Sequence, residues 1–401
     1  MNTRPATTCT VLLAPLLLAL GACGAGNGGV EGHGGDRVVN VYNWADYIAP
    51  DTIEKFEAEY GIEVNYDIYD ASDVVDVKLL AGNSGYDVVV HSNQYASRLA
   101  PIGVFEKLDF SRLDNSRNLD DNTMAKIDSY AEVRGYNIPY HWGSTGYAWN
   151  VEMVRARLPD HPMDSSDVLF DPEVVSKLAD CGVTLLDGPT DMIPMVLAYL
   201  GRDPNAVDDE SLAAAEKQLM AVRPYIRYFS NQKMLSDLPN REVCVAMSWS
   251  GDYAQAAARA EEAGIDIELR YTTPKEGSGL WVDGLYIPSD APHKDNAYLF
   301  LNFILRPDIA ADIANHVNYA NCNRASWEFM DPAILGNPAI FPDEATWDLL
   351  YPITTADPKR ERPRTRVPTT RPRRPRKHRS RAAGTAWPAS GVRPALSTRT
   401  A

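Results

Sequence analysis

Short apolar runs of strand character alternate with amphipathic helical segments along most of the chain. In the first part this pattern predicts strand, helix, strand, helix and strand over residues 38–42, 50–60, 62–68, 74–80 and 86–90. The order returns as strand, helix, strand and helix over residues 182–186, 193–200, 243–247 and 252–263, before late helices at 300–305 and 309–317. Strands that alternate with helices indicate parallel sheets, so we predict an α/β fold with two similar lobes.

Aromatic and acidic side chains gather where these strands end, which is where such sheets bind ligands. In this position are Trp44 and Asp46, Ser92, Asp187 and Asp191, and Trp249 and Asp252. Carboxylates are also common caps at helix starts, so a purely structural role for Asp191 and Asp252 is equally open.

Three segments place a tryptophan shortly before an aspartate, with no Lys or Arg inside them. They are Trp-Ala-Asp-Tyr at 44–47, Trp-Ser-Gly-Asp-Tyr at 249–253 and Trp-Val-Asp at 281–283. Carboxylates neutralise ammonium groups, while aromatic faces cover methylenes and add cation–π attraction of about 0.5 to 2 kcal/mol per contact. A core Trp beside a turn Asp explains one such segment, but three together favour a site for a small organic cation.

Residues 1–23 resemble a lipoprotein export signal. Arg4 precedes an apolar run from Val11 to Leu20, which is too short to span a bilayer, where about 20 residues are needed. The sequence Leu-Gly-Ala-Cys then resembles the bacterial lipoprotein processing box, so we expect Cys23 to carry the lipid anchor; an ordinary secretory signal is the alternative. Residues 24–37 would form a Gly-rich tether. Because no later stretch approaches 18 apolar residues, we expect a soluble, periplasmic body of two domains.

Net charge is unevenly distributed along the chain. Residues 368–401 contain nine Lys or Arg and no Asp or Glu, whereas the first 367 residues carry 30 basic and 54 acidic side chains, a net charge of −24. An Arg/Pro-rich segment without apolar periodicity is expected to be disordered. Its composition is typical of a GC-rich gene read in the wrong frame, so we interpret residues 367–401 as a misframed tail. An exported protein has no nucleic acid to meet, and we expect none as a partner.

Cys181, Cys244 and Cys322 are the cysteines outside the export segment. An exported protein can form a disulfide, but spacing alone does not select a pair. None of the three has the CxxC neighbour that would indicate zinc.

Seven segments together resemble the polyamine (putrescine/spermidine) substrate-binding proteins of bacterial ABC transporters. They are NWADYIAPDTIEKFE at 43–57, the strand at 86–92, CGVTLLDGP at 181–189, RPYIRYF at 223–229, CVAMSWSGDY at 244–253, TTPKEG at 272–277 and HVNYAN at 316–321. The resemblance runs from about residue 38 to 367. It implies the two-lobed periplasmic-binding-protein fold of the second structural type, with a mixed, mainly parallel sheet flanked by helices in each lobe and a hinge between the lobes. The lobes would be 38–141 with 274–318, and 142–273 with 319–366.

The resemblance also implies a ligand pocket, by position. Its residues are Trp44, Asp46, Tyr47, Ser92, Asp191, Trp249, Asp252, Trp281, Asp283 and Tyr319. A disulfide between Cys181 and Cys244 is implied as well, which leaves Cys322 without a counterpart.

The implied function is to bind a polyamine between the lobes and deliver it to the membrane permease of an ABC transporter. Polyamine ammonium groups stay protonated near neutral pH. Asp46, Asp252 and Asp283 would pair with them, and Asp191 would be an additional acceptor. The protein is expected to be a monomer without cofactor, metal or catalytic residues. Ala45, Gln94 and Gly188 depart from the family pattern, and Trp281 is the bulkier of the two aromatics that the family has there. These hints conflict and leave putrescine and spermidine both open.

Three rival functions remain to be weighed. An enzyme is disfavoured because the chain lacks HExxH, GxSxG, a P-loop and a GxGxxG placed after a strand. His91 and His141 are interpreted as structural. The other rivals are a binding protein for another small cationic solute and a receptor that senses polyamine.

Overall fold

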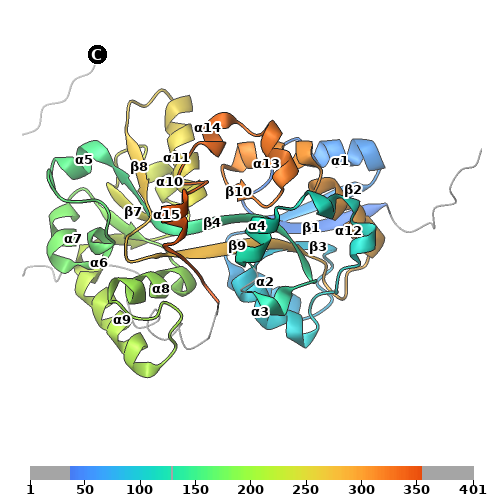
Figure 1. The fold of residues 1–401 in the computed structure, drawn as a ribbon, viewed down its shortest axis with the longest axis horizontal. Helices are drawn as coiled ribbons and strands as arrows, with labels where there is room; N and C mark the ends of the chain where they lie inside the picture. The colour runs from blue at the N-terminus through green and yellow to red at the C-terminus, as the bar shows by residue number, and fades with distance from the viewer. Residues whose placement is uncertain (1–36, 128–129, 355–401) are drawn as a thin grey trace, which may run out of the picture. The chain divides into compact units, whose positions relative to one another are not determined.

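Two strands, β4 (Asn137–Asn150) and β9 (Ser278–Tyr286), run through the middle of the fold and connect its two halves (Figure 1). β4 pairs with β9 from Asn137 to Thr145 and with β7 (Val245–Trp249) from Thr145 to Trp149. The computed structural model describes residues 37–127 and 130–354. The predicted export signal with Cys23, the tether and the 367–401 tail lie outside the described residues.

The strands form one hydrogen-bonded path that is mainly parallel within each half. Its order is β2-β1-β3-β9-β4-β7-β5-β6, with β8 and β10 also on β4 and β11 on β9. β1 is parallel to β2 and β3, β5 is parallel to β6 and β7, and β9 is antiparallel to β3 and β4. The remaining bounds are β1 Val38–Trp44, β2 Glu63–Tyr69, β3 Val88–Ser92, β5 Val183–Leu185, β6 Ile226–Phe229, β8 Leu269–Thr272, β10 Ala320–Asn321 and β11 Leu350–Pro352. The predicted α/β class, with mixed, mainly parallel sheets, is confirmed.

Helices follow most strands, as the alternating pattern predicted. In the first half they are α1 Thr52–Tyr60, α2 Ser72–Leu80, α3 Asn93–Leu99, α4 Asp121–Ile127, α12 Lys294–Ile304 and α13 Pro307–Val317. In the second half they are α5 Val151–Arg155, α6 Asp167–Phe170, α7 Pro172–Leu178, α8 Pro189–Tyr199, α9 Asp209–Val222, α10 Met234–Asp237 and α11 Ser250–Glu262. Two short helices, α14 Pro332–Leu335 and α15 Glu344–Trp347, come last. α8 begins earlier than predicted because Pro189 fits the first helical position, where a missing N–H costs nothing.

Separate clusters of buried apolar side chains support the two halves. One packs β1 and β3 against α12 and α13, and another packs β5 against α8 and α9. Ala320, Cys322 and Met330, beyond the predicted boundary at 319, pack with Tyr42 and Val89 of the first half. The exact lobe boundaries therefore stay a prediction.

The implied disulfide is confirmed. Cys181 and Cys244 are bonded, with their Cα atoms 5.5 Å apart, and the bond closes a loop of 63 residues. A crosslink over a loop of that length contributes about 4 kcal/mol in the chain-entropy account. Cys322 is a buried free thiol, as expected.

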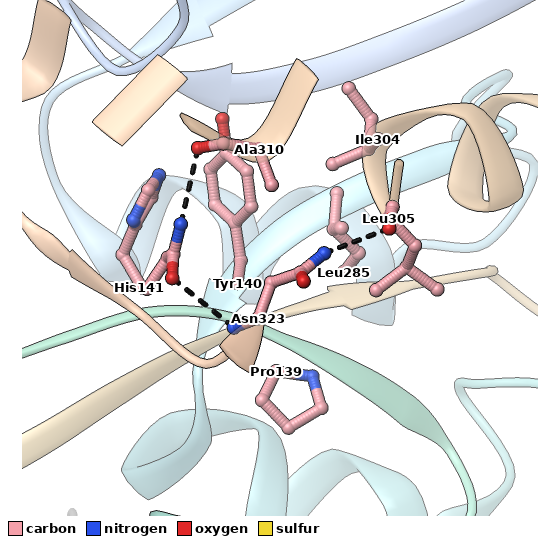
Figure 2. Close-up of a pocket in the computed structure, with 9 residues that line it drawn as sticks. Pro139, Tyr140, His141, Leu285, Ile304, Leu305, Ala310 and Asn323 are labelled. Atoms are coloured by element: carbon pink, nitrogen blue, oxygen red, sulfur yellow. Dashed lines mark hydrogen bonds between the residues drawn. The ribbon is translucent and has the colours of Figure 1, made fainter. Parts of the chain in front are cut away.

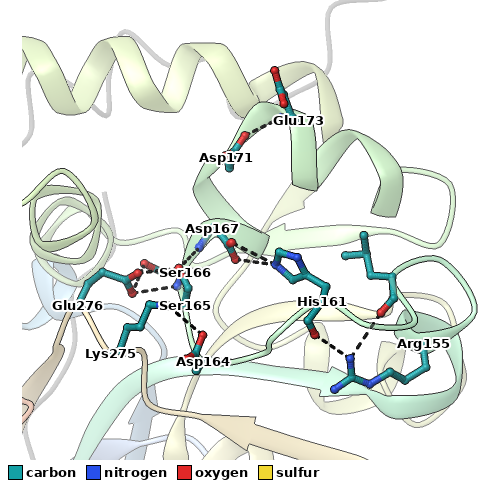
Figure 3. A network of polar contacts seen from close by, with 11 residues as sticks. Arg155, His161, Asp164, Ser165, Ser166, Asp167, Asp171, Glu173, Lys275 and Glu276 are labelled. Atoms are coloured by element: carbon teal, nitrogen blue, oxygen red, sulfur yellow. Dashed lines mark hydrogen bonds and ion pairs between the residues drawn. The ribbon is translucent and has the colours of Figure 1, made fainter.

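A polar network fastens the loop before β9 to the loop after α5 (Figure 3). The Glu276 carboxylate accepts hydrogen bonds from the Ser165 hydroxyl at 2.6 Å and from the Ser166 backbone N–H at 3.1 Å. Because β9 starts at Ser278, this network fixes the entry of the strand that carries two of the expected ligand-binding residues.

Candidate ligand-binding site

The expected ligand-binding residues lie where strands end and helices begin. Trp44 is the last residue of β1, Ser92 of β3 and Trp249 of β7. Asp191 and Asp252 lie in the first turns of α8 and α11. The strand-end rule therefore located this part of the candidate site from the sequence pattern.

Asp191 is buried, and its carboxylate is held by groups from two strands. Its Oδ1 accepts hydrogen bonds from Thr145 Oγ1 at 2.9 Å and from Trp249 Nε1 at 3.1 Å. Burial raises the pKa of Asp191, while these two hydrogen bonds lower it in part. Gly188 holds the N-cap position of α8, so Asp191 is not the cap of that helix.

Asp283 is buried on β9, directly opposite Ser92 on β3. The Ser92 hydroxyl donates a 2.5 Å hydrogen bond to Asp283 Oδ1. Burial raises the pKa of Asp283 to about 6, and the Ser92 and Tyr47 hydroxyls oppose that rise. The Tyr47 hydroxyl itself is buried without a hydrogen bond of ordinary geometry. Only neutral hydroxyl groups therefore stabilise the negative charge of Asp283, and a cation could stabilise it further.

Asp252 forms a matched pair of hydrogen bonds with Tyr319. The Tyr319 hydroxyl donates to Asp252 Oδ1 at 2.6 Å and accepts from the Asp252 backbone N–H at 3.1 Å. Burial raises the pKa of Asp252 to about 6, Tyr319 and Arg259 lower it, and Asp46 raises it. Trp249 holds the N-cap position of α11, so Asp252 lies in the first turn of that helix and is not its cap residue.

The four aspartates form two like-charged pairs. The charge of Asp191 raises the pKa of Asp283, and the charge of Asp46 raises the pKa of Asp252. A cation near Asp191 and Asp283 would relieve their repulsion, whereas Asp46 and Asp252 already have Arg259 beside them.

Aromatic rings lie between and around these carboxylates. Trp281 meets Tyr319 edge to face with ring centroids 5.3 Å apart, and Tyr47 meets Tyr319 at 5.5 Å. Trp44 packs on Tyr69 at 4.3 Å. The indole N–H groups of Trp44 and Trp281 are buried and have no hydrogen-bond partner among the described residues. These rings give the site apolar walls.

Asp46 differs from the other three acids because it is exposed. Its side chain keeps 66% of its accessible area, its backbone adopts a φ of 55°, and it lies 3.6 Å from Arg259 Nη2. Asp46 therefore lies at the rim of the candidate site. Arg259 was missed by the sequence analysis, although it follows Asp252 at the seven-residue spacing that keeps two side chains on one helix face.

Two glycines leave the space that the Tyr319 and Trp281 rings occupy. A Cβ on Gly251 would lie 2.3 Å from the Tyr319 ring, and a Cβ on Gly143 would lie 2.5 Å from the Trp281 ring. Both distances are shorter than any normal contact, so a side chain at either position would displace a ring. Such close approaches depend on tertiary packing, and the sequence pattern gave no signal for them.

A small cavity lies beside β4 and β9, and Tyr140 in its wall donates a hydrogen bond to the Tyr47 carbonyl at 2.9 Å (Figure 2). It measures about 10 Å³ and is lined by Pro139, Tyr140, His141, Leu285, Ile304, Leu305, Ala310, Asn321 and Asn323. That volume suits roughly one water molecule. His141 is buried there, and burial lowers its pKa to about 3, so the ring is neutral at physiological pH. A structural role for His141 fits this setting.

In the described ranges, no cluster of three or more His, Cys, Asp or Glu side chains has an arrangement that could hold a metal ion. Within residues 37–127 and 130–354, no helix has the length and apolar character needed to cross a membrane.

Comparisons with known proteins give the family and the fold of this chain. The family model for bacterial extracellular solute-binding proteins matches residues 51–341. The chain belongs to this family. This solute-binding protein is 43% identical over 332 residues to the putrescine-binding periplasmic protein SpuD of Pseudomonas aeruginosa, covering 82% of the chain and 90% of SpuD. It is 41% identical over 333 residues to the putrescine-binding periplasmic protein PotF of Escherichia coli, with the same coverage of both chains.

A solved structure gives the same view of the fold. The spermidine/putrescine ABC transporter substrate-binding protein PotD of Streptococcus pneumoniae is 26% identical to this solute-binding protein, with a TM-score of 0.68. The alignment covers 82% of this chain and 97% of PotD. The two-lobed periplasmic-binding-protein fold expected from the sequence is confirmed.

Proposed function

We propose that this chain binds a polyamine, putrescine or spermidine, between its two halves and delivers it to the membrane permease of an ABC transporter. The observation that carries the proposal is a set of three carboxylates, of which those of Asp191 and Asp283 are buried and that of Asp252 is partly buried. The hydrogen-bond donors that hold them are three hydroxyls and an indole N–H, all of them neutral. The names of the relatives above support a polyamine as the missing cation.

A diamine fits the two like-charged pairs. One ammonium group would lie near Asp191 and Asp283, and the other near Asp252 and Asp46. Each charge-assisted hydrogen bond contributes roughly 1.5 to 3 kcal/mol. Three or four of them support micromolar or tighter binding, which corresponds to about −8 kcal/mol.

The aromatic walls suit the methylene chain between the ammonium groups. Trp249 and Trp281 would flank that chain, with Trp44, Tyr47 and Tyr319 closing the site around it. An aromatic face excludes water from methylenes and attracts an adjacent ammonium group. A sugar would need hydrogen-bonding side chains in these places, and the indoles offer few.

Ligand binding would favour the closed arrangement of the lobes. Ser92 and Asp283 belong to the predicted first lobe, and Asp191, Trp249 and Asp252 to the second. A ligand that contacts both lobes stabilises the closed form over the open one by its differential contacts. The closed form would then be the one that docks productively on the permease.

The proposal places the protein in the periplasm, as a monomer anchored by lipid on Cys23. The relatives are described as periplasmic binding proteins, which supports the compartment. The anchor rests on the processing box in the sequence. Mass spectrometry of Cys23 in membrane fractions tests it, and an unmodified Cys23 in a soluble fraction would contradict it.

Calorimetric titration of the chain with putrescine, cadaverine, spermidine and spermine tests the binding function. We expect at least one polyamine to bind with micromolar or better affinity. A neutral sugar and L-arginine serve as controls. Binding of every polyamine weaker than millimolar would refute the proposal. Uptake of labelled polyamine by cells that contain the permease, with and without this protein, separates transport from sensing.

A further inference from the structure

The hydroxyl groups of Tyr95 and Thr190 meet between the two halves of the protein, with their oxygen atoms 2.6 Å apart. Tyr95 lies on α3, which starts directly after Ser92. Thr190 lies in the first turn of α8, beside Asp191. The two helices belong to different hydrophobic clusters, and α3 follows β3 of the first half whereas α8 follows β5 of the second. The hydrogen bond therefore joins the halves next to residues expected to hold the ligand.

The Tyr95 ring is braced within the first half. It stacks on the His91 ring with centroids 5.8 Å apart, and the Arg98 guanidinium lies 5.5 Å from its centroid. Asp76 contacts both neighbours, His91 Nε2 at 2.9 Å and Arg98 Nη2 at 2.5 Å. His91 is fully buried and Asp76 nearly so. Because these contacts lie within the first half, they hold the ring in place whether or not Thr190 is near.

We propose that Tyr95 and Thr190 form a closure latch, a hydrogen bond that exists only when the two halves are closed and that slows release of the ligand. The latch rests on the proposed function, because it acts on the same closing motion. When α3 and α8 separate, both hydroxyls return to water. The hydrogen bond therefore stabilises the closed form and does not stabilise the open one. Ligand release requires opening, so loss of the bond speeds release.

Two conservative variants test the latch in the full chain. Tyr95→Phe and Thr190→Val each remove one hydroxyl and keep the shape of the side chain. Stopped-flow dissociation of putrescine should be faster by about 3- to 10-fold in each, as expected for one net hydrogen bond. The association rate should change by less than about twofold, since affinity differences among related complexes lie mostly in dissociation. The double variant should release ligand no more than about twofold faster than either single variant, because both remove the same bond.

Matched controls remove a tyrosine hydroxyl within one half. The Tyr298 hydroxyl accepts the Asp109 backbone N–H at 2.8 Å in the first half, and the Tyr253 hydroxyl donates to the Leu269 carbonyl at 3.3 Å in the second. Tyr298→Phe and Tyr253→Phe should lower the melting temperature slightly and leave the release rate unchanged. Tyr95→Phe and Thr190→Val should show the reverse, with an unchanged melting temperature in the absence of ligand. Control variants that speed release as much as the latch variants would overturn the proposal.

A closure measurement keeps the latch testable if the ligand is not a polyamine. Dyes on Lys107→Cys and Lys177→Cys, both at exposed positions in different halves, report the distance between the halves by energy transfer. Cys322 is buried and should stay unlabelled. The equilibrium constant for closing should fall by about 3- to 10-fold in Tyr95→Phe and in Thr190→Val, the worth of one net hydrogen bond. An unchanged constant in both variants overturns the latch. Failure of wild-type protein to bind any polyamine overturns the proposed function alone.

Discussion

Asp283→Asn should weaken polyamine binding while it stabilises the ligand-free protein, and this opposition of signs is the sharpest test of the site. Asparagine keeps the shape of the side chain and can still accept the hydrogen bond from Ser92. It removes the charge that would face an ammonium group. Binding should weaken by roughly 2 to 4 kcal/mol, or about 30- to 1000-fold.

The gain in stability follows from the raised pKa of Asp283. A shift from 3.8 to about 6 means that burial costs the ionised carboxylate about 3 kcal/mol at pH 7. The folded protein holds this proton more tightly than the unfolded chain does, so the cost shrinks as the pH falls. The cost should be roughly half as large at pH 5 and small at pH 4. Asp283→Asn removes the cost, and its advantage over wild type should therefore fade between pH 7 and pH 4.

Calorimetry and thermal unfolding of the same samples give the assay. Asp295→Asn is the matched control, since its carboxylate is 90% exposed and pairs with Arg112 at the surface. Asp295→Asn should change neither polyamine affinity nor melting temperature measurably, because exposed ion pairs contribute little to stability. A variant Asp283→Asn that melts lower than wild type and keeps its affinity would show a structural carboxylate. That outcome would remove Asp283 from the site.

Other expected outcomes can be checked with the same methods. Polyamine affinity should fall as the pH drops from 7 to 5, because Asp252 and Asp283, with pKa values of about 6, become protonated in this range. Calorimetry at constant ionic strength would show an affinity independent of pH if neither residue binds the ligand. Gly251→Ala should displace the Tyr319 ring and lower affinity by about tenfold or more. Gly201→Ala has open space around the added Cβ but a φ of 68°, so it should lower the melting temperature and leave binding intact. Deleting residues 368–401 should change neither affinity nor melting temperature; an affinity that rises on deletion only at low salt would instead indicate a tail that competes for the acidic site.

Local pattern was enough to predict most of the fold. Strands such as β1 and β3 and helices such as α1 and α11 follow from apolar periodicity within short segments. The positions of Trp44, Ser92 and Trp249 follow from the rule that ligands meet strand ends. The pairing of Cys181 with Cys244 came from family resemblance, because spacing alone allowed other pairs.

The features that sequence analysis missed depend on contacts between segments that are distant in the sequence. β4 is buried along its whole length and carries His141, Ser144 and Thr145, so it shows no alternation of apolar and polar residues. The sequence pattern therefore did not predict β4 as a strand, and Thr145 was missed as a partner of Asp191 for that reason. The exposure of Asp46 was also missed, because a motif does not reveal which of its residues points to solvent.

The shared strand β4 also determines how this protein can be divided. Its first part is paired with β9 and its last part with β7 and β8. A cut at the predicted boundary after residue 141 would leave each fragment with part of a strand and an unpaired sheet edge, which favours aggregation. We therefore expect the two halves to be inseparable as recombinant fragments and to melt in a single transition. Reporter domains for a biosensor belong in surface loops of one half, away from this strand.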